Sequence, residues 1–212
     1  DKEQAEKALE SVHRELNTKY GARVMAPSYK EHAFDGALAL LFNESTKENG
    51  GIFSQPQGWI ILAEALMGHG NRAFEYFSES SPANRTDKAE ISKLEPYCHG
   101  QFTESVDSPF EGRSHVHWLT GTASTVMVGC VEGILGLRPD FNGIKLSPSV
   151  PSDWKEFEIE KDFRGSHLSI KYVNNNGSES GVKKIILNGE EIQGDYIPAS
   201  KLKKDNTVVC EM

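Results

Sequence analysis

The chain has 212 residues, of which 37% are hydrophobic and 25% charged, a composition typical of a folded globular protein rather than a disordered one. Its 23 Lys and Arg against 31 Asp and Glu give a formal net charge of −8, which argues against a nucleic-acid-binding protein. The longest apolar run, residues 59–67, is interrupted by Glu64 and is shorter than the roughly 20 residues that span a bilayer, so we expect no membrane segment.

The start of the chain and its three cysteines indicate what kind of protein the chain comes from and in which compartment it folds. The sequence starts at Asp1 without Met and opens directly into a helical pattern, so we expect a piece of a longer protein. Cys98, Cys130 and Cys210 are few, odd in number and widely spaced. This usage favours free thiols in a reducing compartment, and we expect a cytoplasmic protein.

The first part of the chain has a helical period. Residues 5–16 place apolar side chains on one face of a helix, and residues 59–67 are apolar nearly all round, which predicts a helix buried between others. Gly68 should end that helix, and Asn71 should cap the next one.

A further helix is expected over residues 120–135. Its inward side chains should be Val126, Met127, Cys130, Val131 and Ile134. Gly136 has the position of a glycine that ends a helix.

After Pro139 the pattern changes to short strands. Apolar residues alternate with polar ones around Phe157 and Ile170, and Asn188-Gly189 predicts a tight hairpin after a strand. We therefore expect a mainly α protein with a β appendage: a helical domain over residues 1–140 and a small antiparallel β domain over residues 141–212.

Some motifs favour an ordinary structural role. The run from Gly68 to Ala73 formally matches a dinucleotide fingerprint, but a helix precedes it, so a corner between two helices is favoured. His99, His115 and His117 have no carboxylate or cysteine that completes a metal-ligand set.

Acid catalysis and hydroxyl recognition also have candidates. Glu90, Glu95 and Asp107 are candidate acids, but spacing selects no pair among them. Lys47-Glu48-Asn49-Gly50-Gly51 combines charges, an amide and flexible backbone, as hydroxyl recognition requires, although a solvated turn explains it equally well.

The segment around Thr120 and Gly121 is more specific. It places hydroxyls and a glycine where a helix begins, and the unpaired amides of a helix N-terminus hold anions well. Simple N-capping by Thr120 or Thr122 is the alternative. Physical reasoning alone slightly favours the capping role.

Taken together, the motifs resemble glycoside hydrolase family 94, which includes cellobiose, cellodextrin, laminaribiose and chitobiose phosphorylases. The resemblance covers nearly the whole chain in order. Its most specific segments are residues 47–53, 57–59, 70–77, 95–97, 118–123, 134–139, 151–154 and 163–165.

The resemblance implies a fold and a reaction. The chain would form the C-terminal part of an (α/α) barrel of six helical hairpins, followed by a small antiparallel β-sandwich domain. The family reaction is inverting phosphorolysis: phosphate attacks the anomeric carbon of a β-linked glucose disaccharide or oligosaccharide, and one Asp protonates the leaving oxygen. Phosphate is the co-substrate and no further cofactor is implied. Family members often form dimers, so a homodimer is expected at full length.

The resemblance also assigns roles to individual residues. Thr120, Gly121 and Gln101 match phosphate-binding positions, and Lys47 and Glu48 match positions near the acceptor sugar. Gln55 replaces a phosphate-site histidine of the family, so the affinity for phosphate and its pH dependence should differ.

No counterpart of the general-acid Asp, or of a phosphate-binding Arg, is found in the sequence. We therefore expect no catalytic residue within residues 1–212, and no activity if these residues are the complete chain. Two alternatives remain open: a non-catalytic module that binds carbohydrate or phosphate, and an inverting hydrolase on the same barrel with Glu48 as the base.

Overall fold

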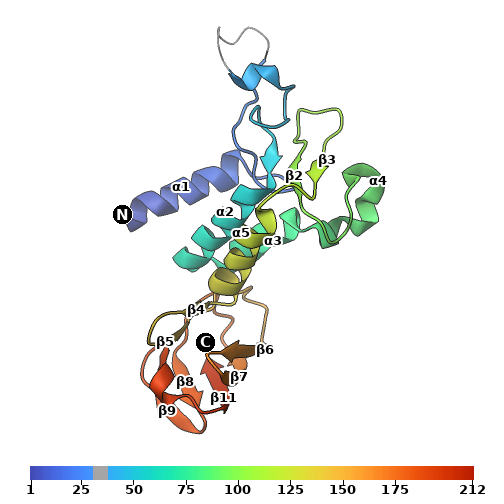
Figure 1. Ribbon diagram of the computed structural model, residues 1–212. Helices are drawn as coiled ribbons and strands as arrows, with labels where there is room; N and C mark the ends of the chain where they lie inside the picture. Colours follow the sequence, from blue (N-terminus) through green and yellow to red (C-terminus); the bar gives the residue numbers. More distant parts are fainter. Residues whose placement is uncertain (31–37) are drawn as a thin grey trace. The chain divides into compact units, whose positions relative to one another are not determined.

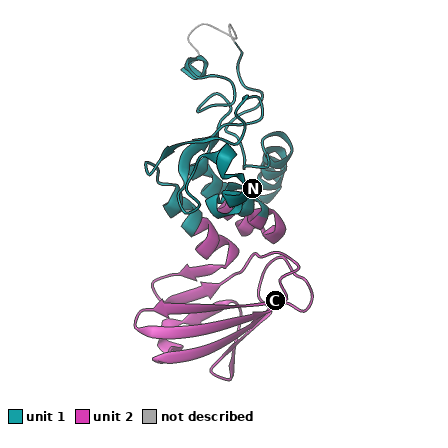
Figure 2. Cartoon of the chain, turned by 90° about the vertical axis from the view of Figure 1, so that its right-hand side faces the viewer, with its two compact units in different colours: residues 1–60, 75–127 teal, residues 61–74, 128–212 magenta. Residues whose placement is uncertain are grey.

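The computed structural model describes residues 1–30 and 38–212, which divide into two compact units. Unit 1 comprises residues 1–60 and 75–127, and unit 2 comprises residues 61–74 and 128–212. Figure 2 shows the two units in teal and magenta. The units are defined by contacts rather than by independent folding, so the division into domains near residue 140 stays a prediction.

Unit 1 combines helices with one small sheet. Its helices are α1 (Lys2–Glu15), η1 (Leu38–Leu41), η2 (Pro82–Lys88), α4 (Ala89–Ser92), the first half of α2 (Ser54–Met67), most of α3 (Gly70–Ser80) and α5 (Thr122–Val128) up to Met127. The strands β1 (Ile52–Phe53), β2 (Gly100–Thr103) and β3 (Ser114–His117) pair antiparallel in the order β1-β2-β3 (Figure 1). Ile52, Tyr76 and Phe102 are buried in its core.

Unit 2 contains two further sheets. Strands β4 (Leu137–Pro139), β5 (Gly143–Leu146) and β10 (Tyr196–Pro198) form one sheet in the order β10-β5-β4. Strands β6 (Glu156–Phe163), β7 (Ser166–Val173), β8 (Lys184–Leu187), β9 (Glu190–Ile192) and β11 (Asp205–Glu211) form the other in the order β6-β7-β11-β8-β9. The short helix η4 (Ala199–Lys201) follows β10.

The core of unit 2 follows from the alternation in its strands. Ile170 on β7 pairs with Val208 on β11, which pairs with Leu187 on β8. All three side chains are buried, so one apolar row crosses the sheet. The predicted hairpin is confirmed, since Asn188 and Gly189 both have positive φ between β8 and β9.

One feature of the β region differs from the prediction of an antiparallel domain. β7 and β11 pair parallel, with Ile170 opposite Val208, whereas the other strand pairs are antiparallel. Parallel pairing requires a long crossover, and the chain between β7 and β11 supplies one through β8, β9 and β10. The alternation of apolar residues does not encode strand direction, so the sequence pattern could not predict the parallel pairing of β7 with β11.

Two predictions for the helices before residue 81 need correction. Within α2, Trp59 and Leu66 are 61% and 57% exposed, so only the side with Ile61 and Ala65 is buried. Asn71 does not cap α3, because α3 begins at Gly70 and the Ala73 amide already donates to the His69 carbonyl. Gly68 does follow the end of α2 with a φ of +89°, as expected.

The helix expected over residues 120–135 is also different in detail. α5 begins at Thr122 and continues into the π-helical segment η3 (Gly129–Ile134). Val126 and Ile134 are buried as predicted, but Met127 is 67% exposed. Each residue turns a helix by about 100°, so Met127 lies off the face that Val126 buries.

Candidate functional site

The sheet β1-β2-β3 connects the segments that carry the candidate residues. Phe53 on β1 pairs with Phe102 on β2, and Gly100 on β2 pairs with His117 on β3. Gln101 therefore lies within the sheet, Gln55 follows β1 at the start of α2, and the Thr120 segment follows β3. The local pairing thus brings together residues that are far apart in the sequence.

Gln55 and Gly121 are neighbours. A Cβ atom built on Gly121 would lie 3.6 Å from Gln55 Nε2, and both residues are exposed. The Thr125 hydroxyl donates to the Gln55 carbonyl over 2.9 Å and so ties α5 to the start of α2. An amide donor and an accessible glycine at a helix start are groups suited to an anion.

Thr120 precedes α5 in the manner of a cap. Its Oγ1 accepts from the Thr122 amide over 3.3 Å and lies 2.6 Å from the Thr122 hydroxyl. Thr120 thus accepts from the first amide of α5, a contact of the kind that the capping alternative predicted. Because this hydroxyl accepts from one backbone amide only, capping and anion binding are compatible at this helix start.

Lys47 and Gln101 form the second pair of candidate residues. Lys47 Nζ donates to Gln101 Oε1 over 3.0 Å and lies 5.3 Å from the centroid of the Phe102 ring. Glu48 is exposed beside them in the chain. A cation held by an amide, with a carboxylate next to it in sequence, offers both donors and acceptors to hydroxyl groups.

The turn that carries Lys47 depends on two of its neighbours. A Cβ atom at Gly51 would lie 2.6 Å from the Lys47 nitrogen, so only glycine fits there. The buried Asn49 side chain accepts from the Tyr29 amide over 2.6 Å and donates to the carbonyls of Tyr29 and Phe42. The turn is thus a fixed structure, which makes a freely solvated loop a poor description of it.

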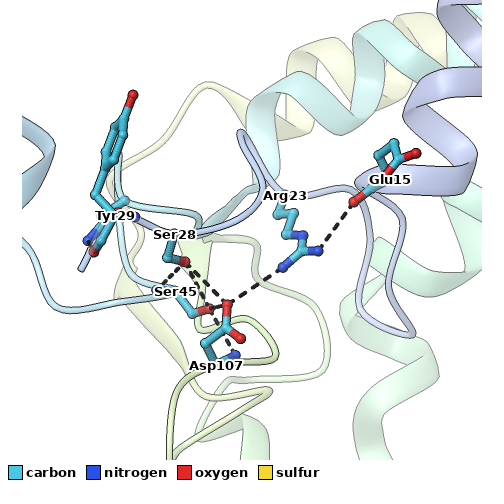
Figure 3. A network of polar contacts seen from close by, with 7 residues as sticks. Glu15, Arg23, Ser28, Tyr29, Ser45 and Asp107 are labelled. Carbon is cyan, nitrogen blue, oxygen red and sulfur yellow. Dashed lines mark hydrogen bonds and ion pairs between the residues drawn. The ribbon is translucent and has the colours of Figure 1, made fainter. Parts of the chain in front are cut away.

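A polar network around Asp107 adjoins this turn through Ser45 and was not predicted from the sequence (Figure 3). Asp107 Oδ2 accepts from the hydroxyls of Ser28 and Ser45 over 3.3 and 3.2 Å, and Arg23 Nη1 lies 3.6 Å from the same oxygen. Arg23 also donates to the Glu15 carbonyl. The candidate acid Asp107 is therefore engaged in holding three chain segments together.

The other candidate acids are also paired. Glu95 lies 3.0 Å from His117 Nδ1 and accepts from the Trp118 indole over 3.3 Å. Its own backbone amide and then the Trp118 N–H lower the pKa of Glu95, so it is ionised at neutral pH. Glu90 is exposed and pairs with Lys93 over 2.9 Å. A general acid has to hold a proton, and neither arrangement favours one.

The three histidines do not converge on one point. His117 pairs with Glu95, whereas His115 pairs with Glu104 over 2.6 Å and stacks on Phe102. Burial lowers the pKa of His99, which keeps it neutral. Within residues 1–30 and 38–212 we find no group of three or more His, Cys, Asp or Glu suited to a metal ion.

Unit 1 thus brings Gln55 close to Gly121 and joins Lys47 to Gln101 by a hydrogen bond. Comparison with known proteins shows the family to which the chain belongs. The model of the catalytic domain of the glycosyl hydrolase 94 superfamily matches residues 1–136. The chain belongs to this family, as its motifs indicated.

Individual relatives extend the comparison over nearly the whole chain. N,N'-diacetylchitobiose phosphorylase of Vibrio proteolyticus is 36% identical over 98% of this chain and 26% of its own length. Solabiose phosphorylase of Paenibacillus borealis is 28% identical over 99% of this chain and 27% of its own length. Cellobionic acid phosphorylase of Neurospora crassa is 27% identical over 95% of this chain and 25% of its own length. The chain therefore spans about a quarter of the length of these relatives.

In the part of the chain that the structure describes, no helix is both long and apolar enough to cross a membrane.

Proposed function

We propose that this chain is part of an inverting phosphorylase that cleaves a β-linked disaccharide or oligosaccharide with inorganic phosphate. The product is an α-sugar 1-phosphate plus a shortened sugar, and no further cofactor takes part. The observation that carries the proposal is the local structure of unit 1, where Gln55 lies beside Gly121 and Lys47 binds Gln101. Membership of a family whose named relatives are phosphorylases supports it.

Phosphate is proposed to bind where α5 begins. Gly121 lets an oxyanion approach the backbone, and the Thr120 hydroxyl and the amides of Gln55 and Gln101 add donors. Gln55 cannot become cationic, so the affinity for phosphate should depend little on the protonation of this group.

The sugar is proposed to contact Lys47 and Glu48. A charged donor and a charged acceptor next to each other make strong hydrogen bonds to hydroxyl groups and discriminate between their orientations. Glu48 as the base of an inverting hydrolase remains the competing role, and dependence of cleavage on phosphate separates the two.

The remaining parts of the reaction are proposed to come from outside residues 1–212. Residues 1–140 would complete an (α/α) barrel with preceding chain that also supplies the general-acid Asp, and residues 141–212 would form the β domain that follows it. The whole protein is proposed to be a cytoplasmic homodimer. On this proposal, residues 1–212 alone bind phosphate or sugar at most and do not cleave.

The identity of the sugar has two candidates. The family resemblance favours a glucose disaccharide of the cellobiose or laminaribiose type. The relative with 36% identity is named for N,N'-diacetylchitobiose, which favours an N-acetylated substrate instead.

The test uses the full-length protein with cellobiose, laminaribiose and N,N'-diacetylchitobiose, each with and without phosphate. Phosphorolysis predicts a sugar 1-phosphate that appears only with phosphate. Free sugar formed equally in both conditions would establish a hydrolase. Binding without cleavage of any of the three would favour the non-catalytic module.

A further inference from the structure

Three separate segments of unit 1 meet at one carboxylate, that of Asp107 (Figure 3). Its Oδ2 atom accepts from the hydroxyls of Ser28 and Ser45 and lies 3.6 Å from Arg23 Nη1. The Asp107 amide in turn donates to the Ser45 hydroxyl over 3.0 Å, and the Ser45 amide donates to the Ser28 hydroxyl over 3.1 Å. The segments around residues 23–28, 45 and 107 are thereby closed into one ring of hydrogen bonds.

The serine hydroxyls depend on this carboxylate. Ser45 is fully buried and Ser28 is 5% exposed, whereas the Asp107 side chain is 43% exposed, so water can reach the two hydroxyls only from the Asp107 side. Ser45 also has a φ of +61°, a backbone conformation that non-glycine residues adopt only where their surroundings hold them. The Ser45 carbonyl also accepts from the Ser105 amide over 2.9 Å, and the Ser45 amide donates to Ser28. Removing the Asp107 carboxylate therefore removes the side-chain part of what fixes the backbone at Ser45.

The backbone at Ser45 leads directly to Lys47. The Thr46 amide donates to the Asn43 carbonyl, and the Asn49 amide donates to the Thr46 carbonyl, so these residues form consecutive turns. Lys47 itself has a φ of +44°. A change in the dihedral angles at Ser45 would swing the Lys47 side chain away from Gln101.

We propose that Asp107 is a positioning residue for Lys47 and Glu48, and through them for the sugar that these residues bind. The proposal rests on the proposed function of the Lys47 turn. Asp107 acts through Ser45 and does not contact the substrate. Its effect should be larger on the sugar than on phosphate, because three of the four phosphate candidates, Thr120, Gly121 and Gln55, lie on other segments. Gln101 is the one phosphate candidate that Lys47 contacts.

The experiment compares variants of the full-length enzyme in phosphorolysis of its disaccharide. Asp107→Ala should raise the KM for the disaccharide about tenfold, as expected when hydrogen bonds to a charged group are lost. The KM for phosphate should stay within about twofold of the parent value. Asp107→Asn keeps an oxygen for the serine hydroxyls and should restore most of the affinity for sugar. The matched control is Asp87→Ala, which removes an exposed carboxylate in η2 and should change neither constant.

A reference variant, Lys47→Ala, separates failure of this inference from failure of the proposed function. If Lys47→Ala raises the KM for the disaccharide and Asp107→Ala does not, Asp107 does not position Lys47. If Asp107→Ala raises both KM values equally, its role is general stability and the inference is wrong. If Lys47→Ala has no effect, the sugar-binding role of the turn fails, and this inference fails with it. Should Asp107→Ala not fold, Ser45→Ala tests the same link, with an increase in the KM for sugar alone as the expected result.

Discussion

Replacing Gly58 by alanine would place a methyl group against the main chain of α5. A Cβ atom built on Gly58 lies 2.3 Å from the Thr125 carbonyl carbon, 2.5 Å from its oxygen and 2.6 Å from the Val126 nitrogen. Ordinary contacts begin near 3.4 Å, and backbone atoms cannot rotate out of the way. The two helices would therefore have to separate by about 1 Å, in a region packed as densely as a crystal.

Two effects of opposite sign decide the stability of this variant. Alanine in a helix interior is favoured over glycine by about 1 kcal/mol, whereas overpacking costs about 3 kcal/mol when the neighbour is backbone. The net loss should be about 2 kcal/mol, or a decrease in Tm of about 4 to 8 °C for a chain of this size. Urea and thermal unfolding followed by circular dichroism measure both quantities.

Gly121→Ala is the matched control, because a Cβ atom there meets only the Gln55 side chain, at 3.6 Å. Its stability should stay within about 0.5 kcal/mol of the parent. Gly58→Ala should also weaken phosphate binding, since Gly58 lies three residues beyond Gln55 on α2 and its contact sets the distance between α2 and α5. A Gly58→Ala variant as stable as the parent would refute the close packing of these helices.

Three further variants test other parts of unit 1. Burial raises the pKa of Glu79 from 4.5 to about 7, so the folded chain retains a proton that the unfolded chain loses, and stability should fall as pH rises from 4.5 to 7. Glu79→Gln should remove that fall in stability. The fall itself should be about 1 to 2 kcal/mol for this half-buried group, measured by urea unfolding at about pH 5 and 8. If the stability of both proteins changed equally with pH, the prediction would be wrong. Asn49→Ala removes three hydrogen bonds to the backbone of Tyr29 and Phe42 and should cost about 3 kcal/mol in urea unfolding. A loss below about 0.5 kcal/mol would show that the turn does not need this amide. Gln55→His should make the KM for phosphate in the full-length enzyme depend on pH near 6.5, the ordinary pKa of histidine, and a flat profile would argue that residue 55 does not face phosphate.

The sequence predicted the elements with a clear period and missed those without one. The Asn188-Gly189 hairpin follows from residues that tolerate positive φ, and the buried row through Ile170 follows from strict alternation. The strands β1, β2 and β3 are two to four residues long, too short for alternation to appear, so no pattern in the sequence predicted them. The small sheet that connects the candidate residues was therefore not predictable from pattern.

The candidate site was predictable only in part, for a related reason. Lys47, Gln101, Gln55 and Gly121 received their proposed roles from the resemblance of their motifs. Helix-terminus physics made anion binding conceivable at Gly121 but slightly favoured capping there. Asp107 was considered as a candidate acid. The two serines that donate hydrogen bonds to it are 62 and 79 residues away in the sequence. No local pattern encodes such a contact, which depends on how the loops fold back.

The two units are stabilised by different means, and this determines where substitutions should matter. In unit 2, rows of apolar side chains such as Ile170, Val208 and Leu187 fill the core, so changes that conserve volume should cost less than about 1.5 kcal/mol.

In unit 1, buried polar side chains tie irregular backbone together. Gln57 accepts from the Ala22 amide and donates to the carbonyls of Ala22 and Phe53, and the buried Arg85 donates to the Tyr20 and Glu79 carbonyls. Each such side chain hydrogen-bonds backbone groups of more than one segment, so an apolar residue of the same size cannot replace it. The candidate residues lie on this irregular backbone, which is why their geometry should be more sensitive to buried amides and guanidinium groups than to the size of core side chains.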